Sequence, residues 1–173
     1  REGLISGNES SLINSVYDSA REFIIGEQQN AGIDLIVEGQ LRWDDMLAHP
    51  LIVHESVESR GLVRYYDNNN FHREPVVVGE LTSSRDVARE LEKTSELVDK
   101  PNAIFPGPYT LSKLATDEYY GSEYSFIEAM GEFVRGEIQQ FPNIGYLTIL
   151  EPSLVVEPPT PDQRELIIEL FKK

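Results

Sequence analysis

The stretch that decides the fold runs Asn102-Ala103-Ile104-Phe105-Pro106-Gly107-Pro108-Tyr109-Thr110. Its first four residues, 102–105, form an apolar run that predicts a short buried strand. The Pro-Gly-Pro segment at 106–108 ends that strand, because proline has no amide hydrogen to donate to a neighbouring strand. A short helix is predicted from Thr110 to Leu114. A strand that passes through a tight turn into a helix is the repeating unit of α/β proteins.

The rest of the chain repeats this alternation. Further runs of apolar and β-branched residues predict strands at 33–37, 76–78 and 144–150. Apolar residues spaced three and four positions apart predict helices at 8–32, 83–99, 125–140 and from Thr160 onward. Asn8 or Ser10 can cap the first helix, and Thr160-Pro161-Asp162-Gln163 opens the last one with a capping-box pattern.

Alternating strands and helices favour a parallel sheet with helical crossovers. We therefore expect residues 1–173 to form a single α/β domain. Four parallel strands cannot close an eight-stranded (β/α)8 barrel, which usually needs about 250 residues. The chain is therefore either an open sheet or a partial TIM barrel, and periodicity alone does not choose between the two.

Residues 41–75 depart from the alternation. A short helical turn is predicted around 44–48, followed by two β-like runs at 51–57 and 62–66 and by the loop Asp67-Asn68-Asn69-Asn70. A segment of this length without a regular crossover predicts an excursion that contains a β-hairpin.

The composition excludes several classes of function. The 15 Lys and Arg residues face 30 Asp and Glu, and the formal net charge of −15 repels phosphate backbones and anionic membranes, so we expect no nucleic-acid or membrane partner. The absence of cysteine excludes disulfides, thiolate catalysis and cysteine-bound metal within these residues. No apolar run approaches the roughly 20 residues of a membrane span and no signal segment opens the chain, so a cytoplasmic location is expected.

Polar residues follow the predicted strands. In a parallel α/β sheet the ligand site lies beyond the carboxyl ends of the strands. We therefore expect one substrate site to be formed by Gln40, Glu80, Tyr109, Thr110 and Glu151. Acidic side chains can hold the ammonium group of an amino acid, and amides or hydroxyls can hold its carboxylate. The alternative is that these residues only cap the helices that follow them.

The excursion contributes further candidates. Trp43, Asp44 and Asn69 are predicted to shape the mouth of the site or a lid over it, although aromatic residues of loops often pack beneath the loop itself. The three histidines, His49, His54 and His72, all fall in this segment. They lack the paired spacing of a metal-binding helix, so no metal site is predicted among them.

Four segments resemble one enzyme family. Glu38-Gly39-Gln40-Leu41-Arg42-Trp43-Asp44-Asp45-Met46 resembles the "DGE-x-x-R-x-DM" segment of the cobalamin-independent methionine synthases, with the glutamine of their archaeal core form. Residues 65–73 resemble the aromatic-Asp-Asn-Asn segment of that form. Residues 106–111 resemble the family's "TGP-x-T" turn, and 149–154 resemble its "IDEPAL" strand end. The four segments follow the family order, so the chain resembles the amino-terminal portion of the catalytic barrel.

The resemblance implies a (β/α)8 barrel that transfers a methyl group to the thiol of homocysteine and so forms methionine. The implied partners are homocysteine and a methyl donor, either a methyl-corrinoid or a methyl-folate. In the family, zinc holds the thiolate through cysteines and a histidine that follow the "DEPAL" strand. Zinc is therefore expected in the complete enzyme but not bound by this chain alone, and a partner chain or a second copy would complete the barrel.

Two departures from the family pattern leave alternatives open. Gln40 and Leu150 replace two acids that hold the homocysteine amine in the family, so amine binding weakens unless Glu80 or Glu151 compensates. One alternative is a non-catalytic scaffold or regulatory homologue of the metal-free half of methionine synthase. Another is a corrinoid or coenzyme-thiol methyltransferase of the same barrel superfamily.

Overall fold

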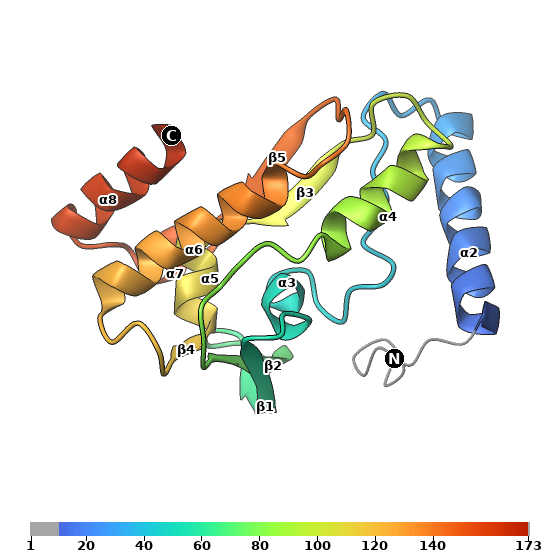
Figure 1. Cartoon of the computed structure of the whole chain (residues 1–173). Coiled ribbons are helices and arrows are strands. Elements are labelled where there is room, and N and C mark those ends of the chain that lie inside the picture. Colours follow the sequence, from blue (N-terminus) through green and yellow to red (C-terminus); the bar gives the residue numbers. More distant parts are fainter. Residues whose placement is uncertain (1–10, 173) are drawn as a thin grey trace.

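The centre of the molecule is a short parallel sheet (Figure 1). The computed structural model describes residues 11–172. Strand β3 (Ala103–Pro106) pairs in parallel with β5 (Leu147–Leu150), and Val37 adds a parallel bridge to Asn102. Val37, β3 and β5 therefore follow one another in chain order, as expected when helical crossovers join neighbouring parallel strands.

The strand predicted at 33–37 is largely absent. Only Val37 has a bridge partner, and the side chains of Ile33 and Leu35 are 48% and 53% exposed. A β-branched run indicates that a segment suits a pleated, half-buried surface, but it does not supply the neighbouring strand that would complete the pairing.

The excursion forms a second sheet. β1 (Val57–Arg64) pairs antiparallel with β2 (Phe71–Val77), and β4 (Thr116–Asp117) pairs in parallel with β2. The predicted hairpin is confirmed, but its strands were misplaced, because the Asn-rich loop is the hairpin turn itself. The predicted strand at 51–57 is wrong: α3 (His49–Ile52) takes its first two residues, a turn follows, and of the predicted strand only Val57 belongs to β1. The predicted strand at 76–78 belongs to this sheet and not to the one that contains β3.

Within residues 11–172, six further helices pack around the sheets. They are α2 (Ser11–Asn30), α4 (Asp86–Ser95), α5 (Pro108–Leu114), α6 (Glu123–Ile138), α7 (Ser153–Val156) and α8 (Pro161–Lys172). The capping box at the start of α8 is confirmed, because Thr160 N donates to Gln163 Oε1 (2.9 Å) and Gln163 N donates to Thr160 Oγ1 (3.3 Å). Helix α4 is shorter than predicted and α7 was not predicted. Asn8 and Ser10, the predicted caps of the first helix, lie outside the described residues.

The main core lies between β3 and the helices α4 and α6. The fully buried ring of Phe105 on β3 belongs to the same apolar cluster as Leu91 of α4 and Phe133 of α6. This arrangement is a mixed α/β fold in which the helices cover one side of the parallel strands, and it fits a part of a TIM barrel. Among residues 11–172 no helix is long and apolar enough to span a membrane.

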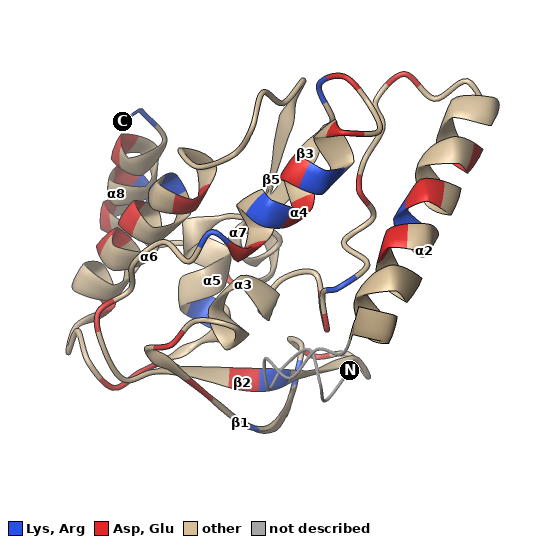
Figure 2. Cartoon of the chain, turned by 45° about the vertical axis from the view of Figure 1, so that its right-hand side comes forward, with Lys and Arg blue, Asp and Glu red and all other residues tan. Residues whose placement is uncertain are grey.

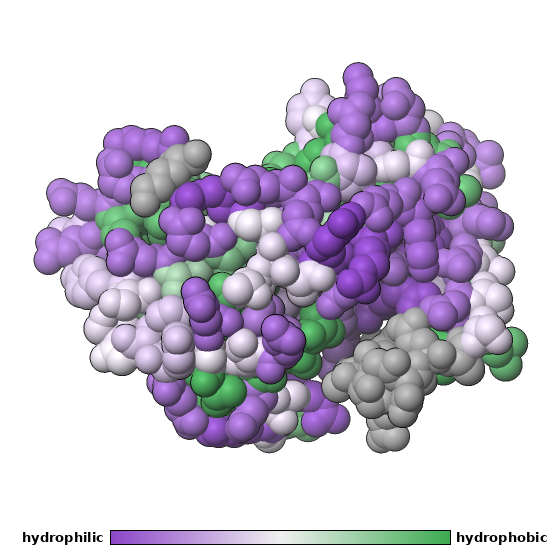
Figure 3. All heavy atoms as spheres, in the orientation of Figure 1, coloured by the Kyte–Doolittle hydropathy of each residue, from purple (hydrophilic) through white to green (hydrophobic). Residues whose placement is uncertain are grey.

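Helix α2 carries an exposed apolar stripe formed by Leu12, Val16 and Phe23, whose side chains are 71%, 60% and 68% exposed. Figure 3 shows hydrophobic residues reaching the surface at several places on the face that it presents. We expect the isolated chain to self-associate, because contiguous apolar patches and unpaired strand edges favour contacts between copies. Light scattering should report a mass above 19.6 kDa that rises with concentration. Phe23→Ser should lower the measured mass, and the neighbouring Glu22→Ser should leave it unchanged. A monomer at every concentration would contradict the prediction.

Candidate functional site

The turn between β3 and α5 is held by the carboxylate of Glu151. This residue directly follows β5, and its two oxygens accept hydrogen bonds from Tyr109 N (3.0 Å) and Thr110 N (2.7 Å). These amides belong to the first turn of α5, where backbone N–H groups have no partner within the helix. Burial raises the pKa of the Glu151 carboxyl, and the hydrogen bonds from Thr110 and Tyr109 oppose that rise in part.

Gly107 makes this approach possible. A Cβ atom built at Gly107 would overlap the carboxyl carbon of Glu151, so any larger residue would displace the carboxylate. The backbone at Gly107 is extended, with φ of −81°, and imposes no strain on other residues. The glycine is therefore needed here for space and not for backbone freedom.

Further hydrogen bonds join this turn to the surrounding loops. Tyr109, whose side chain is buried, donates its hydroxyl hydrogen to the carbonyl of Glu157 (2.7 Å). The amide of Ser153 donates to Thr110 Oγ1 (3.3 Å), and the hydroxyls of Ser153 and Tyr66 are 2.9 Å apart. The carboxyl ends of β3 and β5 and the hairpin loop are thus connected by polar contacts at one place.

Gln40 lies in the loop after Val37, the residue whose bridge to Asn102 precedes β3. Its backbone has a left-handed φ of 51°, and its Nε2 donates to the carbonyl of Ile104 on β3 (3.3 Å). The backbone N–H of Gln40 donates to Glu38 Oε2 (2.7 Å), and this hydrogen bond helps to fix the loop. The structure therefore brings Tyr109, Thr110 and Glu151 into direct contact and places Gln40 against the neighbouring part of β3.

Glu80 is not joined to the others by any contact in the described part of the chain. It is exposed and follows β2, which belongs to the other sheet. Asn69 is exposed in the hairpin loop, and Asp44 is half-buried, with its amide donating to His49 Nδ1 (3.0 Å). Trp43 is 9% exposed and its ring packs edge-on against Phe105, so its side chain belongs to the core, and it also lines the small cavity beside Glu38 and Gln40.

The histidines have structural neighbours. His49 stacks on Trp43, and burial lowers its pKa. His54 Nδ1 accepts from Ser56 N (3.0 Å), while its ring lies edge-on to Phe133. His72 stacks on Tyr65. Within residues 11–172 no three side chains of His, Cys, Asp or Glu gather as a metal ion requires.

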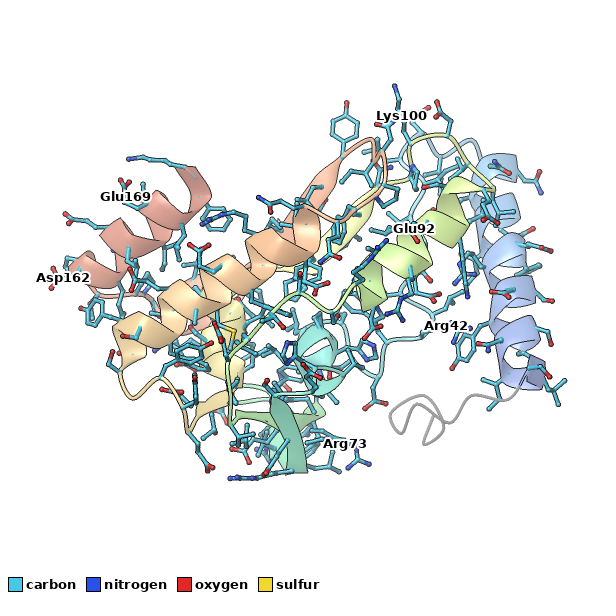
Figure 4. All side chains as sticks on the ribbon, viewed as in Figure 1. Arg42, Arg73, Glu92, Lys100, Asp162 and Glu169 are labelled. Atoms are coloured by element: carbon cyan, nitrogen blue, oxygen red, sulfur yellow. The ribbon has the colours of Figure 1, made fainter. Side chains whose placement is uncertain are left out.

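A buried ionic cluster between α2 and α4 was not predicted. Arg21 of α2 is 2% exposed and forms ion pairs with Asp18 (2.8 Å) and with Glu90 of α4. Figure 2 shows acidic and basic segments along both helices. Arg42 reaches the same region (Figure 4). Its Nε lies 3.2 Å from Glu90 Oε2, and its Nη2 donates to Asn14 Oδ1 (2.7 Å). Nothing in the local periodicity marks these residues, because each occupies an ordinary polar position of its helix or loop.

Three glutamates with raised pKa values make stability depend on pH: Glu38 and Glu137 are buried and Glu151 is half-buried. Burial raises the pKa of Glu38, Glu137 and Glu151 above the ordinary 4.5. Above pH 4.5 the folded chain therefore keeps protons that the unfolded chain has released, so the free energy of unfolding falls as the pH rises from there toward neutrality. Urea denaturation between pH 4.5 and 7 should show this decline, and Glu137→Gln should reduce its slope. A free energy that rises over this range would contradict the prediction.

No protein-family model matches the chain. Curated proteins named methionine synthase do match it. The one from Pyrococcus horikoshii is 25% identical over 163 residues, which cover 87% of this chain and 45% of the relative. The one from Sulfolobus acidocaldarius is 22% identical over 147 residues, which cover 82% and 43%. The chain therefore spans a little under half the length of these relatives.

A solved structure has a similar fold. It is a B12-independent methionine synthase from Shewanella sp. W3-18-1 in complex with selenomethionine, and it superposes with a TM-score of 0.74 at 19% identity. The match covers 86% of this chain and 45% of that one. Its identity is too low to show more than the fold. The chain is thus similar in sequence to archaeal methionine synthases over most of its length, and its fold is similar to part of a B12-independent methionine synthase.

Proposed function

We propose that this chain forms the homocysteine-side wall of a methyltransferase that transfers a methyl group to the thiol of homocysteine. The observation that carries the proposal is the turn at Gly107, clasped by Glu151 at the carboxyl ends of two parallel strands. Ligands of parallel α/β sheets bind beyond these strand ends. The two segments that build the clasp are also those that resemble the "TGP-x-T" and "IDEPAL" segments of the family.

The residues of this wall would bind and orient the substrate. Gln40, Glu80, Tyr109, Thr110 and Glu151 remain the proposed substrate residues. Because Glu151 and the hydroxyl of Tyr109 are already engaged within the chain, their contribution would be to fix the α5 turn in place. Such fixed geometry matters for methyl transfer, since a correctly held nucleophile avoids much of the entropic cost of the reaction.

The described residues do not fit a zinc site. They contain no suitable group of ligands, and the sequence has no cysteine to hold zinc as the family does. We therefore propose that zinc in a complete enzyme is held by residues other than these, from a longer chain or a partner chain. Zinc bound beside the substrate would lower the pKa of its thiol and keep it ionised.

Two measurements test the proposal. Titration of the labelled chain with L-homocysteine, followed by NMR, should shift the amide signals of residues around Gln40 and Thr110. Mixing the chain with homocysteine, zinc and either methyl-cobalamin or methyl-folate should give no methionine, because the metal ligands are missing. The absence of homocysteine binding would refute the substrate role, and turnover would refute the catalytic incompleteness.

A second candidate is a non-catalytic scaffold. It is favoured by the neutral residues Gln40 and Leu150 at two positions where the family has acids, and by the full engagement of Glu151 in capping α5. Elemental analysis of the complete gene product separates the two functions. Stoichiometric zinc favours the methyltransferase, and its absence favours the scaffold.

A further inference from the structure

The residue that neutralises the substrate ammonium group needs a carboxylate with an available oxygen. Gln40 is neutral and Glu80 is exposed in the other sheet. Both oxygens of Glu151 accept hydrogen bonds from α5. None of the acidic positions expected from the sequence therefore offers a buried, unengaged carboxylate oxygen.

Glu38 does offer one. Its side chain is 8% exposed, and its Oε2 accepts from Gln40 N. Its Oε1 is buried and accepts no hydrogen bond within the described residues. The nearest cation is Arg21, at 3.9 Å, and this distance is too long for a hydrogen bond. Arg21 instead directs its hydrogen bonds to Asp18 and Glu90.

Glu38 and Gln40 line the same small cavity. It has a volume of about 80 Å³, is partly open, and lies between the loop after Val37, β3 and α4. The Gln40 Nε2 group donates one hydrogen to the carbonyl of Ile104, which orients the side-chain amide. The Oε1 atom of that amide is the acceptor that a ligand could use. Because the cavity is small and partly open, it suits the ammonium end of an amino acid, with the rest of the molecule outside.

We propose that Glu38 provides the negative charge for the ammonium group of the amino-acid substrate, with the side-chain amide oxygen of Gln40 as a second acceptor. The inference rests on the proposed function, because it takes homocysteine as the ligand. It makes Glu38 a specificity-determining residue that distinguishes an α-amino acid from the same thiol without the amine. A buried carboxylate gains most from such a partner, because charge-assisted hydrogen bonds are strongest where water is excluded.

Burial gives independent support. It raises the pKa of Glu38, while the charge of Arg21 opposes the rise. A second cation beside Oε1 would favour the ionised form and offset the cost of burying it. The empty acceptor thus has a physical reason to bind a cationic donor in preference to a neutral one.

The test compares L-homocysteine with 4-mercaptobutyrate, which is the same molecule without the amine. Dissociation constants are measured by NMR titration of the wild-type chain and of Glu38→Gln, Glu38→Asp and Glu128→Gln. In the wild type, homocysteine should bind about 10- to 100-fold more tightly than 4-mercaptobutyrate, the range expected for one charge-assisted hydrogen bond. Glu38→Gln should abolish this preference, Glu38→Asp should keep part of it, and the matched charge removal Glu128→Gln, at an exposed position of α6, should leave it unchanged.

The outcomes are distinguishable. If the wild type binds homocysteine and Glu38→Gln retains the preference, the role of Glu38 is refuted and the proposed function stands. If Glu128→Gln abolishes the preference as well, the effect is one of net charge and the role of Glu38 is refuted. If the wild type binds neither thiol, both proposals fail. Should Glu38→Gln not fold, Glu38→Asp decides: an undiminished preference, despite withdrawal of the carboxylate by one methylene, refutes the proposal.

Discussion

Arg21→Met is expected to lower the free energy of unfolding by about 1.5–3 kcal/mol, because it removes the charge-assisted hydrogen bonds of a buried guanidinium while Arg42 and Lys93 still pair with Glu90. Arg21 is 2% exposed and pairs with Glu90, which is 16% exposed on α4. It is also the nearest cation to Glu38. Methionine keeps much of the side-chain volume, so the loss reports on charge rather than on a cavity. Urea denaturation at neutral pH measures it.

The matched control is Arg89→Met. Arg89 is 62% exposed and pairs with Asp86 across one turn of α4. Exposed ion pairs of this kind contribute about 0–1 kcal/mol, so its effect should be small. Equal losses for the two variants would contradict the view that the cluster joins α2 to α4 through buried charge.

Gly107→Ala is expected to cost about 3 kcal/mol, at the upper end of the range for overpacking a buried site. The new methyl group would overlap the carboxyl carbon of Glu151 and break the clasp on α5. Thermal or urea denaturation measures the loss, and weaker binding of homocysteine should accompany it under the proposed function.

A double-mutant cycle separates this clash from other effects. Glu151→Ala removes the overlapping atoms but leaves the amides of Tyr109 and Thr110 without their acceptor. Because the clash cannot occur once the carboxylate is absent, Gly107→Ala should cost little in the Glu151→Ala background. Additive losses would show that the glycine and the carboxylate act independently.

The helices could be predicted from the sequence because their signals are local. α6 begins after Ser122, whose hydroxyl accepts from Ser125 N, and α8 begins at a capping box. Both helices were predicted within about two residues at their starts. Apolar periodicity and caps lie within a few neighbouring positions, so no knowledge of the tertiary structure is needed.

The strands depended on partners distant in sequence. Residues 33–37 have the composition of a strand, yet only Val37 meets β3. Residues 51–57 appeared β-like, but Pro50 lies at the start of a helical turn, and Asp45 Oδ1 accepts from Ala48 N just before it. Short apolar runs do not distinguish a strand from a buried helical turn.

The candidate site was predictable only in part. Tyr109, Thr110 and Glu151 were expected at strand ends, and they meet because β3 and β5 are parallel neighbours. The pairing of Arg21 with Glu90 joins positions 69 residues apart, so it became visible only in three dimensions. Glu80 was expected beside them because its strand was assigned to the wrong sheet.

The contact between Tyr66 and Ser153 spans 87 residues with two hydroxyl groups. This hydrogen bond joins the hairpin to the turn that follows β5, and it needs both hydroxyl oxygens. Tyr66→Phe removes one of them while keeping the aromatic ring. This change should therefore weaken the attachment of the hairpin to the turn after β5 without altering the residues that build the clasp.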